Sequence, residues 1–260
     1  MYVMYLTYHR TLFQIFSFIL SALVIHFIVK KLQLKRYDLK IANHKRSAII
    51  SLIVVLITVI IISPLVGIFM KVFASNGLKG SAAVIFFVIT GLLQITPLII
   101  ITLLRKESLY SLGITKKNVY TSVLIGFISY IIYFAFMFIM KQYRFPFPTN
   151  SVFSLLSLVN FSLVAFAEEI LIRGYLQTRL TEWLGNQIGL ILTAFIFSFS
   201  HLIPMILSGN MNLSHAIISC ISLFPIGLFL GYLFSKCKNI VPSTIFHTLY
   251  SFFMNYISIY

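Results

Sequence analysis

The stretch at residues 164–177 reads VAFAEEILIRGYLQ. It is apolar enough to lie in a bilayer, yet it holds two adjacent carboxylates, Glu168 and Glu169, and places Arg173 four positions after the second. The whole chain has only five acidic residues. A buried carboxylate is costly unless it is paired, protonated or used in chemistry. The stretch therefore predicts a membrane helix whose polar residues serve a specific purpose.

The composition around this stretch is that of a membrane protein. The 260 residues are 60% hydrophobic and 10% charged, and the mean hydropathy is +1.00. A soluble domain averages about 25% charged residues. The net charge of +15 comes from Lys and Arg residues that fall between apolar runs. Such residues mark membrane topology, so we expect the lipid bilayer as a partner and no nucleic acid.

Eight apolar segments are long enough to cross a bilayer, which takes a helix of about 20 residues. They are residues 11–29, 48–70, 82–104, 119–140, 152–172, 187–207, 214–235 and 240–259. The fifth is expected to continue as an amphipathic helix to about residue 183. The fold class is therefore all-α, a polytopic membrane helical bundle of about eight transmembrane helices.

The basic residues gather in alternate connections, at residues 30–46, 105–117, 173–179 and 236–238. The positive-inside rule places these connections in the cytoplasm and both termini outside. We expect a multi-pass protein of the cell membrane, and the compact size suggests a bacterial plasma membrane.

The chain is expected to form one membrane domain, with accessory helices in residues 1–118 and a catalytic core in residues 119–260. Within the seventh segment, Gly227 and Gly231 stand four residues apart. Small residues at that spacing allow helices to approach closely, so this pair predicts a tight helix contact.

Helical spacing separates the roles of the two glutamates. Glu169 and Arg173 stand at positions i and i+4, share a helix face and are expected to form an ion pair. Glu168 is rotated by about 100° from Glu169. Like charges this close disfavour double ionisation. Glu168, the freer of the two, is therefore the candidate general base.

Two of the six histidines, His201 and His247, lie well inside apolar runs. From a rise of about 1.5 Å per residue, both are expected at a depth similar to that of Glu168. The three side chains could then converge in one cavity.

These motifs resemble those of the CPBP family, which comprises the type II CAAX-prenyl proteases and bacterial bacteriocin-processing or self-immunity (Abi) proteins. Glu168, Glu169 and Arg173 match a Glu-Glu-x-x-x-Arg motif, Phe197 and His201 a Phe-x-x-x-His motif, and His247 the last motif. The resemblance covers roughly residues 150–255. It departs at Ser251, where the family usually has Asn.

The resemblance implies an intramembrane endopeptidase. Glu168, aided by His201, would activate water, and His247 and Ser251 would stabilise the oxyanion. Glu169, Arg173 and Phe197 would support these residues. No cofactor is firmly implied by the sequence, which has no His-Glu-x-x-His motif. Zn²⁺ bound by Glu168, His201 and His247 stays open as an alternative.

The expected substrate is a membrane-embedded or lipidated peptide. A bacterial chain would process a leader peptide, pheromone or bacteriocin, or confer self-immunity. One alternative is a non-enzymatic immunity or scaffold protein with the same fold, for which the Ser251 departure is the best support. A proton-coupled transporter is the other, although the repeated halves common in transporters are not visible in the sequence.

Overall fold

The computed structural model describes residues 2–32, 34, 41, 43–65, 68, 81–140, 143–144, 155–207, 212–254 and 258–259. Its first half contains α1 (Tyr2–Leu32), α2 (His44–Ile57), the π-helix η1 (Thr58–Ile62), α4 (Ser81–Leu104), the 3₁₀-helix η2 (Leu109–Leu112), α5 (Val119–Ile139) and β1 (Tyr143–Arg144). Its second half contains α6 (Leu155–Glu169), the π-helix η3 (Ile170–Gln177), α7 (Thr178–Leu184), α8 (Asn186–Ser200), α9 (Leu202–Leu207), α10 (Leu213–Cys237), α11 (Val241–Met254) and β2 (Ser258–Ile259).

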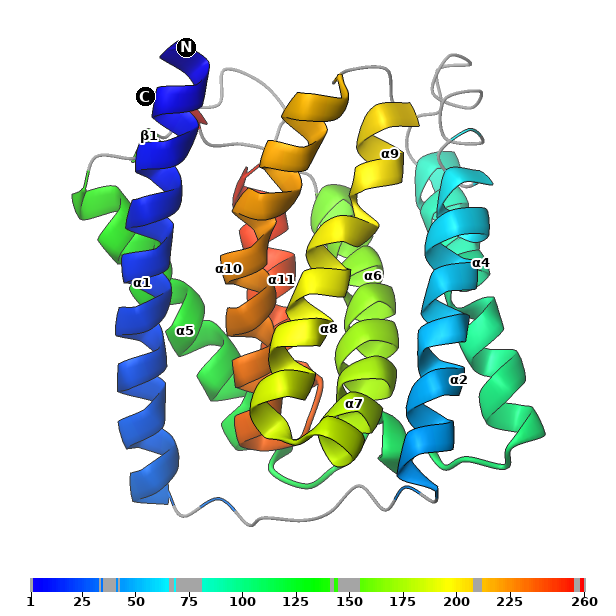
Figure 1. The fold of residues 1–260 in the computed structure, drawn as a ribbon. Helices are drawn as coiled ribbons and strands as arrows, with labels where there is room; N and C mark the ends of the chain where they lie inside the picture. The colour runs from blue at the N-terminus through cyan, green and yellow to red at the C-terminus, as the bar shows by residue number, and fades with distance from the viewer. Residues whose placement is uncertain are drawn as a thin grey trace.

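The helices run side by side as a bundle (Figure 1), which confirms the predicted fold class. Each of the eight predicted segments overlaps helical structure among its described residues. Five described spans are long and apolar enough to cross a membrane, namely Thr11–Leu32, His44–Leu65, Val119–Ile139, Asn186–Leu207 and Leu213–Cys237. The chain is therefore a multi-pass membrane protein, while the number of crossings stays a prediction.

The fifth predicted segment continues without interruption through α6, η3 and α7 to Leu184, which confirms its expected extension. The end predicted for the last segment is wrong. α11 ends at Met254, and Ser258–Ile259 instead forms an antiparallel pair with Tyr143–Arg144. Ile259 stands opposite Tyr143 in this pair, and both residue types favour extended structure.

The basic connections share one end of the bundle. The end of α1, the start of α2, α7 and the end of α10 all lie at the bottom of Figure 1, whereas the start of α1 and β2 lie at the top. This arrangement agrees with both termini on one side of the membrane. Which side they occupy stays a prediction.

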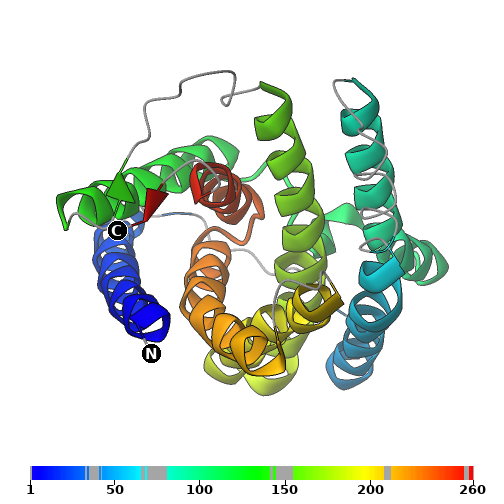
Figure 2. The same cartoon turned by 90° about the horizontal axis from the view of Figure 1, so that it is seen from above.

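Seen from above, α6 stands between α11 and α4 (Figure 2), and it packs against both. An aromatic cluster joins α1, α5, α10 and α11. The ring of Phe18 stacks on Tyr133 at 5.1 Å and on Phe229 at 5.2 Å, and Phe246 meets Phe229 edge-on at 4.9 Å. This cluster fixes α11 against α10, so the residues of α11 hold defined positions opposite α6 and η3.

The backbone of η3 passes very close to η2. A Cβ atom at Gly174 would collide with the carbonyl oxygen of Leu112. Only a glycine leaves room for this approach, which brings the connection after α4 against the helix that carries the two glutamates.

We therefore expect Gly174→Ala to destabilise the protein by about 1–3 kcal/mol, the usual cost of overpacking a filled core. The measurement is the Tm of the full chain in detergent. Gly91→Ala in α4 is the matched control, because no atom lies within 4 Å of an added Cβ there and alanine favours a helix over glycine. Equal Tm values for the two variants would contradict the close approach.

Candidate active site

The helix that carries the two glutamates changes its winding directly after them. α6 ends at Glu169, and η3 follows as a π-helix over Ile170–Gln177, with all eight residues buried. π-helical turns are rare and are found mostly at functional sites. A change of winding directly after the two glutamates is therefore typical of a functional site.

Glu169 is a fully buried carboxylate with two polar partners. Its Oε2 atom lies 3.5 Å from Nε of Arg173, whose side chain is also fully buried. Its Oε1 atom lies 3.0 Å from Nδ1 of His247. The pair at positions i and i+4 is therefore formed as predicted. Because breaking a buried pair leaves an uncompensated charge, these contacts fix Glu169 to the bundle interior.

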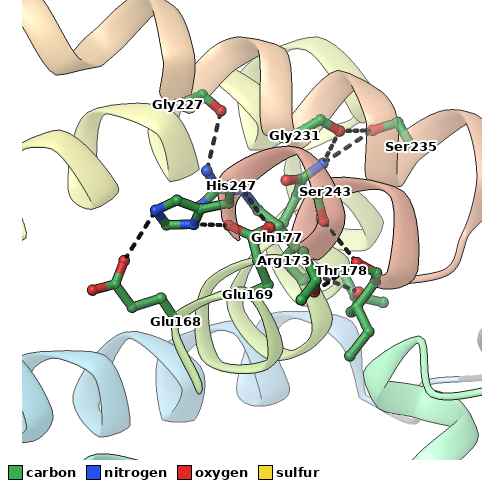
Figure 3. Close-up of polar contacts among 12 residues, drawn as sticks. Glu168, Glu169, Arg173, Gln177, Thr178, Gly227, Gly231, Ser235, Ser243 and His247 are labelled. Carbon is green, nitrogen blue, oxygen red and sulfur yellow. Dashed lines mark hydrogen bonds and ion pairs between the residues drawn. The ribbon is translucent and has the colours of Figure 1, made fainter. Parts of the chain in front are cut away.

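His247 lies between the two glutamates (Figure 3). A carboxylate that is paired with arginine accepts hydrogen bonds, so Nδ1 of His247 donates to Glu169. The other ring nitrogen, Nε2, then faces Glu168, with 3.8 Å between Nε2 and Oε2. That separation exceeds a hydrogen bond. His247 is thus held from one side and presents its other nitrogen to the second carboxylate.

Glu168 differs from Glu169 in exposure and in its bonding. Its side chain is 28% exposed, whereas that of Glu169 is fully buried. Its Oε2 atom has no hydrogen-bond partner in the described structure. The two adjacent carboxylates therefore differ: Glu169 is bound by Arg173 and His247, whereas Oε2 of Glu168 accepts no hydrogen bond.

Two polar side chains of η3 donate hydrogen bonds to the backbone of two glycines in α10. Arg173 Nη2 donates to the carbonyl oxygen of Gly227 at 3.4 Å, and Gln177 Nε2 donates to that of Gly231 at 2.9 Å. A Cβ at Gly227 would lie 3.1 Å from the Ala194 carbonyl oxygen. The predicted close approach at Gly227 and Gly231 is thus confirmed. Sequence reasoning missed Gln177, although its spacing of four from Arg173 matches that of the glycines.

The ring of Phe197 forms the centre of the site. The guanidinium of Arg173 lies 4.4 Å from its centroid. The rings of His247 and His201 meet it edge-on, at 5.8 Å and 5.1 Å between centroids. Phe197 is therefore a packing residue that all three polar side chains share.

His201 borders the cluster. It follows the last residue of α8, and its Nδ1 donates to the carbonyl oxygen of Phe197 at 2.9 Å. No hydrogen bond or ion pair of the described residues joins it to Glu168. Ser251 lies one turn beyond His247 in α11 and is half-buried. Of the predicted site residues, Glu168, Glu169, Arg173, Phe197 and His247 thus come together, with His201 at the border and Ser251 on the next turn.

The three residues considered for Zn²⁺ do not form a ligand set in this arrangement. Zinc ligands surround one point at about 2.0–2.2 Å. Among the described residues, no group of three or more His, Cys, Asp or Glu side chains is placed to hold a metal ion. His201 contacts Phe197 rather than Glu168 or His247.

Residues 150–253 match the family described as Type II CAAX prenyl endopeptidase Rce1-like. The match confirms the family resemblance of the motifs, and it spans every residue predicted for the site. No curated protein and no solved structure matches the chain at a significant level.

The buried ion pair makes a prediction about stability. Arg173→Met leaves the Glu169 carboxylate without its main counter-charge, so we expect a loss of about 3–5 kcal/mol. Adding Glu169→Gln removes the uncompensated charge and should recover part of that loss in a Tm measurement. Arg46→Met is the control, because Arg46 is exposed at the start of α2. If the double variant is no more stable than Arg173→Met, the two residues are not coupled.

Proposed function

We propose that the chain cleaves peptide bonds in the membrane with Glu168 as general base. Its bundle of apolar helices and the match of residues 150–253 to the type II CAAX prenyl endopeptidase Rce1-like family support this activity. The observation that carries this proposal is the unequal state of the two glutamates. Glu169 is bound by Arg173 and His247, while Glu168 is partly exposed and keeps a free acceptor atom beside His247.

Glu168 would take a proton from a water molecule, and the hydroxide would attack the carbonyl carbon of the scissile bond. His201 supports this step. Because its Nδ1 donates to Phe197, the neutral ring has its lone pair on Nε2 and can accept a proton there. The proton held by Glu168 would then pass to the departing amine, which returns the carboxylate to its starting state.

His247 would stabilise the oxyanion formed by the attack. With Nδ1–H held by Glu169, Nε2 is turned towards Glu168, and it would donate a hydrogen bond to the oxyanion when it carries a proton. A positioned donor of this kind is worth about 2.7–4 kcal/mol in the transition state. Glu169 and Arg173 act by holding His247 in place. The Ser251 hydroxyl, one turn further along α11, is proposed as a second donor, where the family usually has an amide.

The substrate is proposed to be a membrane-associated or lipidated peptide. The name of the matched family points to prenylated CAAX sequences. For a bacterial chain, a leader peptide, pheromone or bacteriocin is the corresponding proposal, with self-immunity as its biological outcome. In either case, the bilayer would bring the scissile peptide bond to Glu168.

The test is cleavage of two quenched fluorescent peptides by the full chain in nanodiscs, one farnesylated at a CAAX terminus and one with a double-glycine leader. We expect Glu168→Gln to lower the rate roughly 100- to 10,000-fold, the range for loss of a general base, without lowering Tm. Glu182→Gln is the matched control, because Glu182 is exposed in α7.

Unchanged cleavage in Glu168→Gln would refute Glu168 as the base. If the wild-type chain cleaves neither peptide, the immunity or scaffold alternative is favoured over the protease.

The dependence on metal has its own test. Because the site residues do not form a metal-binding cluster, we expect cleavage to persist after dialysis against a chelator, with less than one equivalent of metal per chain by elemental analysis. Loss of cleavage that added Zn²⁺ restores would show that Glu168 and the histidines rearrange around a metal.

A further inference from the structure

A second ion pair lies near the end of the helical segment that carries Glu168. Arg179 in α7 is fully buried, and its Nη2 donates to Oε2 of Glu107. Its Nη1 donates to the Tyr175 carbonyl oxygen at 3.0 Å, and its guanidinium lies 3.8 Å from the centroid of the Tyr175 ring. Burial lowers the pKa of Arg179 and the Glu107 carboxylate opposes this change. Arginine stays protonated in proteins, so the pair is ionic.

Glu107 is in turn held by the N-terminal half of the chain. It follows α4, outside the residues that match the family. Its Oε1 accepts a hydrogen bond from Nε of Arg105 at 2.7 Å, and Nη2 of Arg105 donates to the buried Ser47 of α2 at 2.8 Å. A chain of polar contacts thus runs from α2 through the turn after α4 to α7.

The helix between the two ion pairs needs such an anchor. α6, η3 and α7 form one continuous helical segment, with Glu168 near its centre and Arg179 near its end. The π-helical winding in between is rare, and contacts from other helices hold the segment on both sides of it. Glu169 is fixed at one end of η3 by Arg173 and His247, and Arg179 is fixed beyond the other end by Glu107.

We propose that Glu107 is a positioning residue of the active site, which acts through Arg179 to set the register of the helix so that Glu168 faces His247. The proposal rests on the proposed function, because it assigns Glu107 a role in that reaction. It also assigns a role in catalysis to the helices before residue 118. They hold Glu107, which binds Arg179, and Glu107 lies outside residues 150–253 that match the family. A misplacement of about 1 Å at a reacting group can cost roughly 100-fold in rate.

The test compares Glu107→Gln with the double variant Glu107→Gln/Arg179→Met, using the two peptides above in nanodiscs. Glu107→Gln leaves a buried unpaired guanidinium and should lower both Tm and kcat. The double variant removes that charge, so its Tm should recover while kcat stays roughly 10- to 100-fold below wild type and KM changes less than about twofold. Glu107→Asp should restore part of kcat. Glu182→Gln is the control at an exposed glutamate.

A double variant that regains both Tm and wild-type kcat would overturn the proposal, because Glu107 would then be needed for folding alone. Hydrogen exchange of the full chain gives a readout that does not depend on activity. Glu107→Gln/Arg179→Met should speed exchange in residues 170–184 and leave residues 119–139 unchanged. If the wild-type chain cleaves neither peptide but this exchange pattern is found, the proposed function fails and the anchor stands. An unchanged pattern overturns the anchor itself.

Discussion

The carboxylate of Glu169 is the constraint on which the rest of the structure depends. It has no exposed surface and lies in a bundle that is otherwise almost free of acidic residues. An ionised group in such a place must be paired and hydrogen-bonded. Arg173 from the next turn and His247 from α11 meet that requirement. The pairing of the Glu169 carboxylate with His247 thus holds α11 next to α6.

The need to pair Glu169 also explains how α8 and α10 pack around Arg173. Arg173 must itself be held, and it is covered by the Phe197 ring of α8 and by the carbonyl oxygen of Gly227 in α10. A side chain at Gly227 would crowd Ala194 and Phe197, so the glycine allows three helices to meet at the arginine. Because Glu169 takes up these partners, Oε2 of Glu168 is left without a hydrogen bond. Two identical neighbouring residues thus acquire one structural role and one proposed chemical role.

The sequence predicted the parts of this arrangement that depend on local spacing. Apolar length located the helices, and the i,i+4 rule identified the Glu169–Arg173 pair. Partners from distant helices could not be derived in this way, since no periodicity relates Glu107 to Arg179 or Gln177 to Gly231. The π-helical winding of η3 was missed because propensity does not distinguish it from an α-helix. The strand at Ser258–Ile259 was missed because its partner at Tyr143–Arg144 is equally short. The motif matches identified His201 as a site residue. Its contact with Phe197, rather than with Glu168, depends on the packing of α8 and could not be derived from spacing.

The central claim is that Glu169 holds His247 by Nδ1 and turns Nε2 towards Glu168. The most direct measurement is a ¹⁵N NMR spectrum of the full chain in nanodiscs with labelled histidine, assigned to His247 by comparison with a His247→Gln variant. The account predicts a protonated Nδ1 in the wild type and a marked change of its resonance in Glu169→Gln, with little change in Glu182→Gln. An unprotonated Nδ1, or a resonance that Glu169→Gln leaves unchanged, would contradict it.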